Sequence, residues 1–120
     1  MTHRMSLPYP RQEVVITPHG RVRLDPEAID GASAQCLDLT IRESEGALLF
    51  YEDGIAFLAD RGGEHVWLYK DIDSYSIRKS MMGLRKLTLV TNGGRVRFRI
   101  GDMLAANADC ILTTRGADKK

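Results

Sequence analysis

The chain has 120 residues, of which 43% are hydrophobic, and its formal net charge is +1. This length predicts one domain with a hydrophobic core of its own, and this hydrophobic fraction excludes a chain that is disordered throughout. No apolar run reaches the roughly 18 residues of a membrane-spanning helix, and residues 1–10 are polar, unlike a secretory signal, so we expect a cytoplasmic protein.

The first third of the chain predicts a disordered start followed by short elements. We expect disorder over residues 1–10, one domain over 11–115 and a polar tail over 116–120. Short strands are expected at 13–17 and 21–24, on either side of a Pro-His-Gly turn.

A helical turn, a connection and another strand are predicted next. Asp25 suits an N-cap and Pro26 suits the first helical position, so we expect one turn of helix that ends near Asp30. Residues 31–34 are small and indicate a connection. Residues 36–42 alternate between apolar and polar side chains, which predicts a strand with one face in the core.

The centre of the chain predicts a series of hairpins. Asp53-Gly54 and Asn92-Gly93 each stand between two apolar runs, which is a strong hairpin signal. The strands expected in this region are 47–51, 55–59, 64–69, 73–79, 85–91 and 95–100.

One helix is predicted at the C-terminal end. Asp102 suits an N-cap, and the helix should end near Thr113 or Thr114, ahead of Gly116. Its apolar stripe is Leu104, Ala108, Ile111 and Leu112. Many short strands followed by one amphipathic helix predict an all-β, mainly antiparallel roll or barrel with one C-terminal α-helix that covers it.

Little in the sequence supports catalysis. The histidines at positions 3, 19 and 65 have no carboxylate or cysteine at a catalytic or metal-ligand spacing. Cys36 and Cys110 are too few and too far apart for a zinc site or a disulfide framework, so we expect two buried free thiols. We therefore predict a protein that is not an enzyme and that has no cofactor and no metal site.

Charge is unevenly distributed along the chain. Residues 11–60 carry four basic and ten acidic side chains, whereas residues 70–100 carry eight basic and two acidic ones. Such asymmetry concerns partners rather than fold. It fits attraction between the two parts, within one molecule or between two copies, and it equally fits binding of an anionic partner.

The last predicted hairpin has a basic face. Arg95, Arg97 and Arg99 alternate with apolar residues and so share the outward face of their strand, to which the preceding strands add Lys86 and Arg78. Like charges on one face repel each other, and guanidinium groups suit phosphate or carboxylate. The face is either a solvated surface paired to the acidic half or a site for an anionic lipid or an acidic peptide. Nucleic acid is disfavoured because no aromatic residues interleave with the charges.

An apolar loop lies between two basic pairs. Met81, Met82 and Leu84 stand between Arg78-Lys79 and Arg85-Lys86. An apolar tip with cations on both sides is typical of a loop that touches a membrane, and methionines suit adaptable protein contacts. Alternatively, Met81 and Leu84 fold over the open end of the roll.

Three segments carry a resemblance to a known family. They are an apolar hairpin at 48–57 (LLFYEDGIAF), a strand with an Asp-Ile step at 67–75 (WLYKDIDSY) and the last hairpin at 87–99 (LTLVTNGGRVRFR). Over residues 46–112 the chain resembles the pleckstrin-homology-like (PH-like) superfamily, in particular its bacterial and GRAM-type members. The resemblance implies a stiff barrel that binds phosphoinositides, peptides or another copy. Its lipid-binding members carry Lys and Arg-x-Arg on the first hairpin rather than the last, so we do not transfer that lipid site.

The central strands are apolar on both faces, unlike a sheet that is wet on one side. The resemblance implies that one set of side chains points into the core: Phe50, Phe57, Trp67 and Tyr69. It implies that another set points outward: Leu49, Leu58, Val66 and Leu68. This outer set needs a cover, which is either the N-terminal segment or a second subunit, and we assign it as an interface between copies.

The sequence therefore predicts a non-catalytic PH-like binding or scaffold module that self-associates. Its basic face, with Arg97 at the centre, is expected to contact an acidic peptide or a lipid headgroup. If the partner is a lipid headgroup, the protein would lie peripherally at a membrane. The alternative is a purely structural homo-oligomeric protein with no small-molecule ligand.

Overall fold

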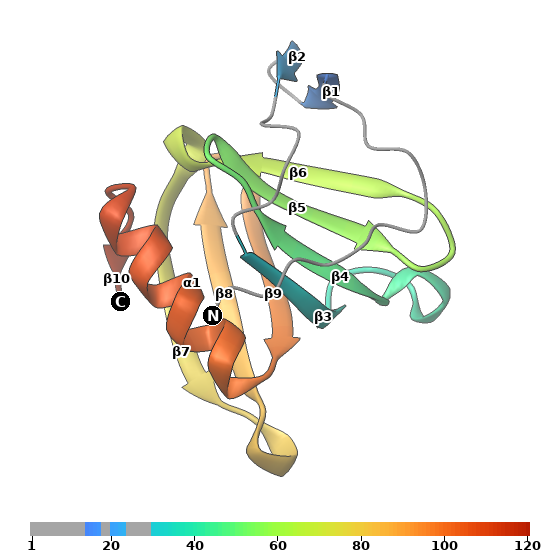
Figure 1. The fold of residues 1–120 in the computed structure, drawn as a ribbon, viewed down its shortest axis with the longest axis vertical. Helices are drawn as coiled ribbons and strands as arrows, with labels where there is room; N and C mark the ends of the chain where they lie inside the picture. Colours follow the sequence, from blue (N-terminus) through green and yellow to red (C-terminus); the bar gives the residue numbers. More distant parts are fainter. Residues whose placement is uncertain (1–13, 18–19, 24–29) are drawn as a thin grey trace.

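The computed structural model describes residues 14–17, 20–23 and 30–120, with side chains described from Asp30 onward (Figure 1). The disorder predicted for residues 1–10 lies outside the described residues. So does the helical turn predicted after Asp25, except for Asp30, which begins a strand.

An antiparallel sheet of eight strands forms most of the described chain. Its strands are β3 (Asp30–Cys36), β4 (Glu45–Phe50), β5 (Gly54–Ala59), β6 (Glu64–Leu68), β7 (Ile72–Lys79), β8 (Arg85–Thr91), β9 (Gly94–Ile100) and β10 (Asp118–Lys119). Their order is β10-β7-β8-β9-β3-β4-β5-β6, and only the β10–β7 pair is parallel. A separate hairpin pairs β1 (Val14–Thr17) with β2 (Gly20–Arg23), and β1 lies beside β6.

The sheet folds back on itself around one main core. Strand β3 pairs with β4 along its length and with β9 at its end, so it joins the β4–β6 half to the β7–β9 half. Figure 1 shows these halves as two layers that cross, with helix α1 (Asp102–Thr114) against the β7–β9 side. Phe57, Trp67 and Phe98 meet inside, with the Trp67 and Phe98 ring centroids 5.5 Å apart. The predicted β-rich fold with one C-terminal helix is confirmed.

The elements predicted for residues 31–42 differ from those in the structure. The predicted connection at 31–34 is part of the strand, and the predicted strand at 36–42 is mostly a turn followed by the 3-10 helix η1 (Ile41–Glu43). Gly31 suits the close approach of β4, because a Cβ there would collide with the Leu49 side chain. Ile41, expected to face the core, is 92% exposed.

In the C-terminal region the predicted helix is confirmed, and the prediction of a polar tail is corrected. Helix α1 ends at Thr114 ahead of Gly116, whose φ of 92° is a conformation that glycine adopts without strain. Gly101 rather than Asp102 is the N-cap residue. The predicted polar tail contains β10, which pairs with β7. No helix in the described part of the chain is long and apolar enough to cross a membrane.

The apolar central strands bury two separate clusters of side chains. The predicted inward set, Phe50, Phe57, Trp67 and Tyr69, packs in the main core, as expected. The predicted outward set packs in a second cluster with Tyr51 and Ala56. Within one chain, Leu49, Leu58 and Leu68 are at most 4% exposed, and Val66 is partly buried. Three of the four residues of the outer set are therefore buried within one chain, and Val66 is the member that keeps some exposed surface.

Candidate anion-binding site

Three cations stand side by side across three strands of the sheet. Arg78 on β7 pairs with Lys86 on β8, and Lys86 pairs with Arg99 on β9. Alternate residues of β8 and β9, such as Leu87 and Phe98, are fully buried, so the three cations occupy the outer face. Directly paired side chains on one face have Cβ atoms about 5 Å apart. We call Arg78, Lys86 and Arg99 the basic row.

Hydrogen bonds hold both guanidinium groups of the basic row in place. Arg99 donates to the Ser80 hydroxyl at 3.1 Å and to the Gln35 side-chain oxygen at 3.0 Å. Arg78 donates to the backbone oxygens of Ile77 and Lys120 at 3.4 and 3.3 Å. Both acceptors of Arg99 are neutral side-chain groups, which hold its guanidinium in place without neutralising it.

Carboxylates lie farther along the same register. Gln35 on β3 pairs with Arg99 and, on its other side, with Glu45 on β4. The nearest acidic residue in this line of paired residues is therefore two strands away from Arg99. Like charges directly opposite each other destabilise a sheet unless an anion offsets them. This arrangement is that of a surface that would accept an anion.

Arg97 is tied to a carboxylate, contrary to its predicted role at the centre of the site. Its guanidinium donates to both carboxylate oxygens of Asp38, with the shortest contact at 2.9 Å, and its backbone amide donates to Asp38 at 2.6 Å. Hydrogen bonding from Arg97 lowers the pKa of the Asp38 carboxyl below its ordinary value. Arg97 is thus neutralised by the protein itself and is not the central free cation of the face.

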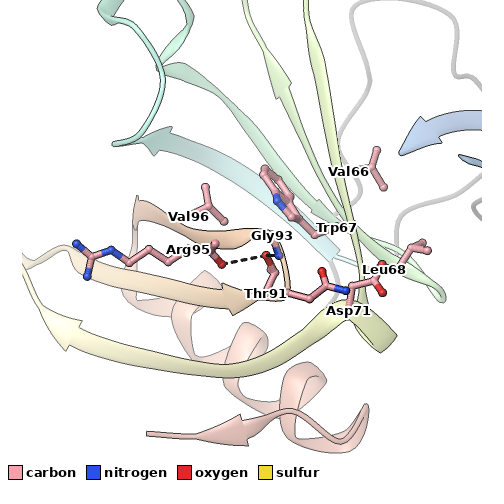
Figure 2. Close-up of a pocket in the computed structure, with 10 residues that line it drawn as sticks. Val66, Trp67, Leu68, Asp71, Thr91, Gly93, Arg95 and Val96 are labelled. Carbon is pink, nitrogen blue, oxygen red and sulfur yellow. Dashed lines mark hydrogen bonds between the residues drawn. The ribbon is translucent and has the colours of Figure 1, made fainter. Parts of the chain in front are cut away.

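Arg95 lies apart from the basic row. It is four residues from Arg99 on β9, which corresponds to about 13 Å along an extended strand. A cleft with a volume of about 420 Å³ opens beside it, between β6 and the β8–β9 turn, with Trp67, Leu68 and Gly93 among its lining residues. Figure 2 shows the Arg95 side chain extending away from this cleft. Arg95 is thus among the residues that line the cleft, but its charged end points away from it (Figure 2), and the lining is mainly apolar.

The β7–β8 loop (residues 80–84) stands out into solvent at the end of the basic row. Met81 is 65% exposed, Met82 96% and Leu84 37%. The exposure of Met81 does not fit the alternative in which it folds over the open end of the roll, whereas Leu84 is mostly covered. The loop is closed by two backbone hydrogen bonds, from Ser80 to the Leu84 oxygen at 2.9 Å and from Leu84 to the Met81 oxygen at 3.1 Å.

A polar cluster around one buried tyrosine attaches helix α1 to β7. The fully buried Tyr75 donates its hydroxyl to the Asp109 carboxylate at 2.5 Å and lies 2.6 Å from the Thr113 hydroxyl. Lys119 of β10 completes the cluster with a 2.9 Å ion pair to Asp109. Burial, then the bond to Asp109, raises the Tyr75 pKa, and hydrogen bonds from Tyr75 and Lys119 lower the Asp109 pKa. The partners of the tyrosine hydroxyl lie on α1, so the cluster joins the helix to the sheet.

Two features near the loop were missed by the sequence analysis. Arg85 on β8 forms a 2.8 Å ion pair with Asp102 at the start of α1, and the next residue, Met103, is 81% exposed. Met103 lies outside the predicted apolar stripe of the helix, and this position off the stripe is the sequence signal that could have indicated its exposure.

Cys110 is exposed, so the prediction of two buried thiols holds only for Cys36, whose pKa is raised by burial.

No protein-family model matches the chain, and no curated protein matches its sequence. Within the described residues, no group of His, Cys, Asp and Glu side chains is arranged to hold a metal ion.

Proposed function

We propose that this chain is a non-catalytic binding module of the PH-like type, whose basic face contacts an anionic partner. The observation that carries the proposal is the basic row: Arg78, Lys86 and Arg99 are paired across three adjacent strands with no carboxylate between them.

The arrangement of strands supports the PH-like part of the proposal. Seven antiparallel strands, β3 to β9, follow one another along the chain, and the first pairs with the last. One helix follows directly and packs its buried residues Leu104, Ala108 and Leu112 against the core of the roll. A roll of antiparallel strands followed by one packed helix is compatible with the barrel that the resemblance implies, and it supports the PH-like part of the proposal.

The energetic argument depends on how many cations face the partner. A Lys or Arg close to an anionic surface contributes about 1 kcal/mol, so the three cations of the row contribute about 3 kcal/mol, or roughly a hundredfold in affinity. Arg97 adds little, because Asp38 already holds it.

The structural alternative has less support. It requires the outer apolar set to meet a second copy, yet Leu49, Leu58 and Leu68 are buried within one chain. The basic row, in contrast, lies on the outer face of the sheet, and no carboxylate stands between its three members in the strand register.

The test is binding of the purified protein to three probes: neutral phosphatidylcholine vesicles, vesicles that also contain phosphatidylserine, and immobilised poly-glutamate. We expect co-sedimentation with the phosphatidylserine vesicles only, with an affinity that falls as salt is raised, because ions screen exposed charges. Retention on poly-glutamate without vesicle binding would support the proposal with an acidic protein as partner. Absence of binding to both anionic probes would overturn it.

A further inference from the structure

The β7–β8 loop exposes apolar side chains to solvent. Within the described residues, large hydrophobic side chains that are exposed number six, and four of them lie in this loop or at the start of α1: Met81, Met82, Leu84 and Met103. Solvent-exposed apolar groups that gather at one end of a molecule indicate a contact surface.

Met82 has a backbone conformation that a methionine rarely adopts. Its φ of 57° and ψ of 38° lie in the left-handed region, and among the described residues it is the only one other than glycine with a positive φ. A side chain that is 96% exposed does not offset this strain by packing within the chain. A strained backbone that no contact within the chain stabilises indicates a role in binding another molecule.

Cations surround the loop on both strands. Residues 78–86 and 99–103 contain Arg78, Lys79, Arg85, Lys86 and Arg99, against a single carboxylate, Asp102, which leaves a net charge of +4 at this end. Asp102 is already engaged by Arg85 at 2.8 Å. The loop is the part of this end that projects farthest beyond the sheet and helix in Figure 1.

We infer that the β7–β8 loop inserts its methionines into an anionic lipid bilayer while the basic row contacts the headgroups. This inference rests on the proposed function and names a membrane as the partner. It adds a binding element, Met81, Met82 and Leu84, to a site that otherwise consists of charges.

The order of apolar and charged groups along the strands favours a bilayer over an acidic protein. Lys86 is two residues behind Leu84, or about 7 Å along an extended strand. Interfacial protein segments bury their apolar side about 5–10 Å into the boundary between headgroups and acyl chains. A loop at the acyl boundary therefore places Lys86 and its neighbours Arg78 and Arg99 at headgroup level.

The first experiment compares wild type with Met81→Ser/Met82→Asn on phosphatidylserine-containing vesicles. We expect the double variant to bind about tenfold more weakly, because the apolar contribution is lost while the charges remain. The matched control is Ile41→Ser, which removes a side chain that is 92% exposed on η1, away from the loop, and should bind as wild type does. Equal affinity of the double variant and wild type would overturn the inference.

The second experiment reads insertion directly. Met82→Trp should shift its emission to the blue on binding phosphatidylserine vesicles, and lipids brominated in the acyl chain should quench it, whereas Ile41→Trp should show neither effect. Bound protein whose new tryptophan stays unquenched would overturn insertion and leave charge-driven binding in place. A wild type that is retained by poly-glutamate but binds no vesicle would overturn the inference alone, and one that binds neither would overturn the proposed function as well.

Discussion

Arg97 and Asp38 are 59 residues apart in the sequence and form a forked ion pair, with the Arg97 Nη2 atom 2.9 Å from Asp38 Oδ1. The backbone amide of Arg97 donates to the same carboxylate, so Asp38 fixes the turn after β3 to the middle of β9. This contact divides the basic face. It withdraws Arg97 from anion binding and leaves the row of Arg78, Lys86 and Arg99 as the surface that an anion can reach.

We expect Asp38→Asn to lower stability at pH 7 and to have less effect in acid. Arg97 lowers the pKa of Asp38 in the folded state, so the stabilisation is complete above the unfolded-state value of about 3.9 and is lost as the pH falls through the lower folded value. The pair is about one-third exposed, so the fall in Tm at pH 7 should be small, about 2–4 °C. Thermal unfolding at pH 7 and pH 3 checks this. The control is Asp60→Asn, which removes an exposed carboxylate. A Tm difference between wild type and Asp38→Asn that is larger at pH 3 than at pH 7 would contradict the prediction.

Tyr75→Phe is expected to reduce the free energy of unfolding by about 1–2 kcal/mol. The change keeps the buried ring and removes the hydroxyl that bonds Asp109 and Thr113, so it loosens the attachment of α1 to β7. Urea unfolding measures the effect. A variant as stable as wild type would show that the ion pair of Lys119 with Asp109 suffices to hold the helix.

Gly46→Ala should be more destabilising than Gly31→Ala. A Cβ at Gly46 would collide with the backbone of Leu58 and Ala59 on β5, which cannot move without breaking the β4–β5 pairing. A Cβ at Gly31 meets the end of the Leu49 side chain, which can rotate. We expect a loss of about 2–3 kcal/mol or more at Gly46 and about 1 kcal/mol at Gly31, by urea unfolding. The reverse order would contradict the assigned strand register.

Met82→Asn is expected to raise the free energy of unfolding by about 0.5–1 kcal/mol, because asparagine tolerates the left-handed conformation better than methionine. The exposed side chain contributes no packing that the change could remove. The same variant should bind anionic vesicles less well, so stability and binding would move in opposite directions. A loss of stability would show that the methionine packs within the chain.

The sequence was sufficient for the elements whose signal is local. Asp53-Gly54 and Asn92-Gly93 predicted the β4–β5 and β8–β9 hairpins, and the apolar stripe predicted α1. Strand β3 was not predicted because Gly31 reads as a connection in the sequence, whereas its small size suits the close approach of β4, which is a tertiary constraint. Strand β10 escaped because its two residues carry no period, and its position depends on pairing with β7.

The sequence could predict which residues share the basic face, but not which of their charges are held in an ion pair. Alternation along β8 and β9 places Lys86 and Arg99 outward, and the register then brings them together. Alternation does not reveal that Asp38 holds Arg97, because the two are joined only by the β3–β9 contact. The exposure of Met82 likewise depends on a loop conformation that the sequence did not indicate.

The central claim is that the basic row, with Lys86 at its middle, binds the anionic partner. The most direct test is the affinity of Lys86→Glu for phosphatidylserine-containing vesicles, measured beside Lys70→Glu, which reverses an exposed lysine on the 3-10 helix η2 (Tyr69–Asp71). We predict that Lys86→Glu loses about 2 kcal/mol, or roughly thirtyfold, because one attraction becomes a repulsion, while Lys70→Glu binds nearly as wild type does. Equal losses for the two variants would contradict the account, since the binding would then follow net charge and not the row.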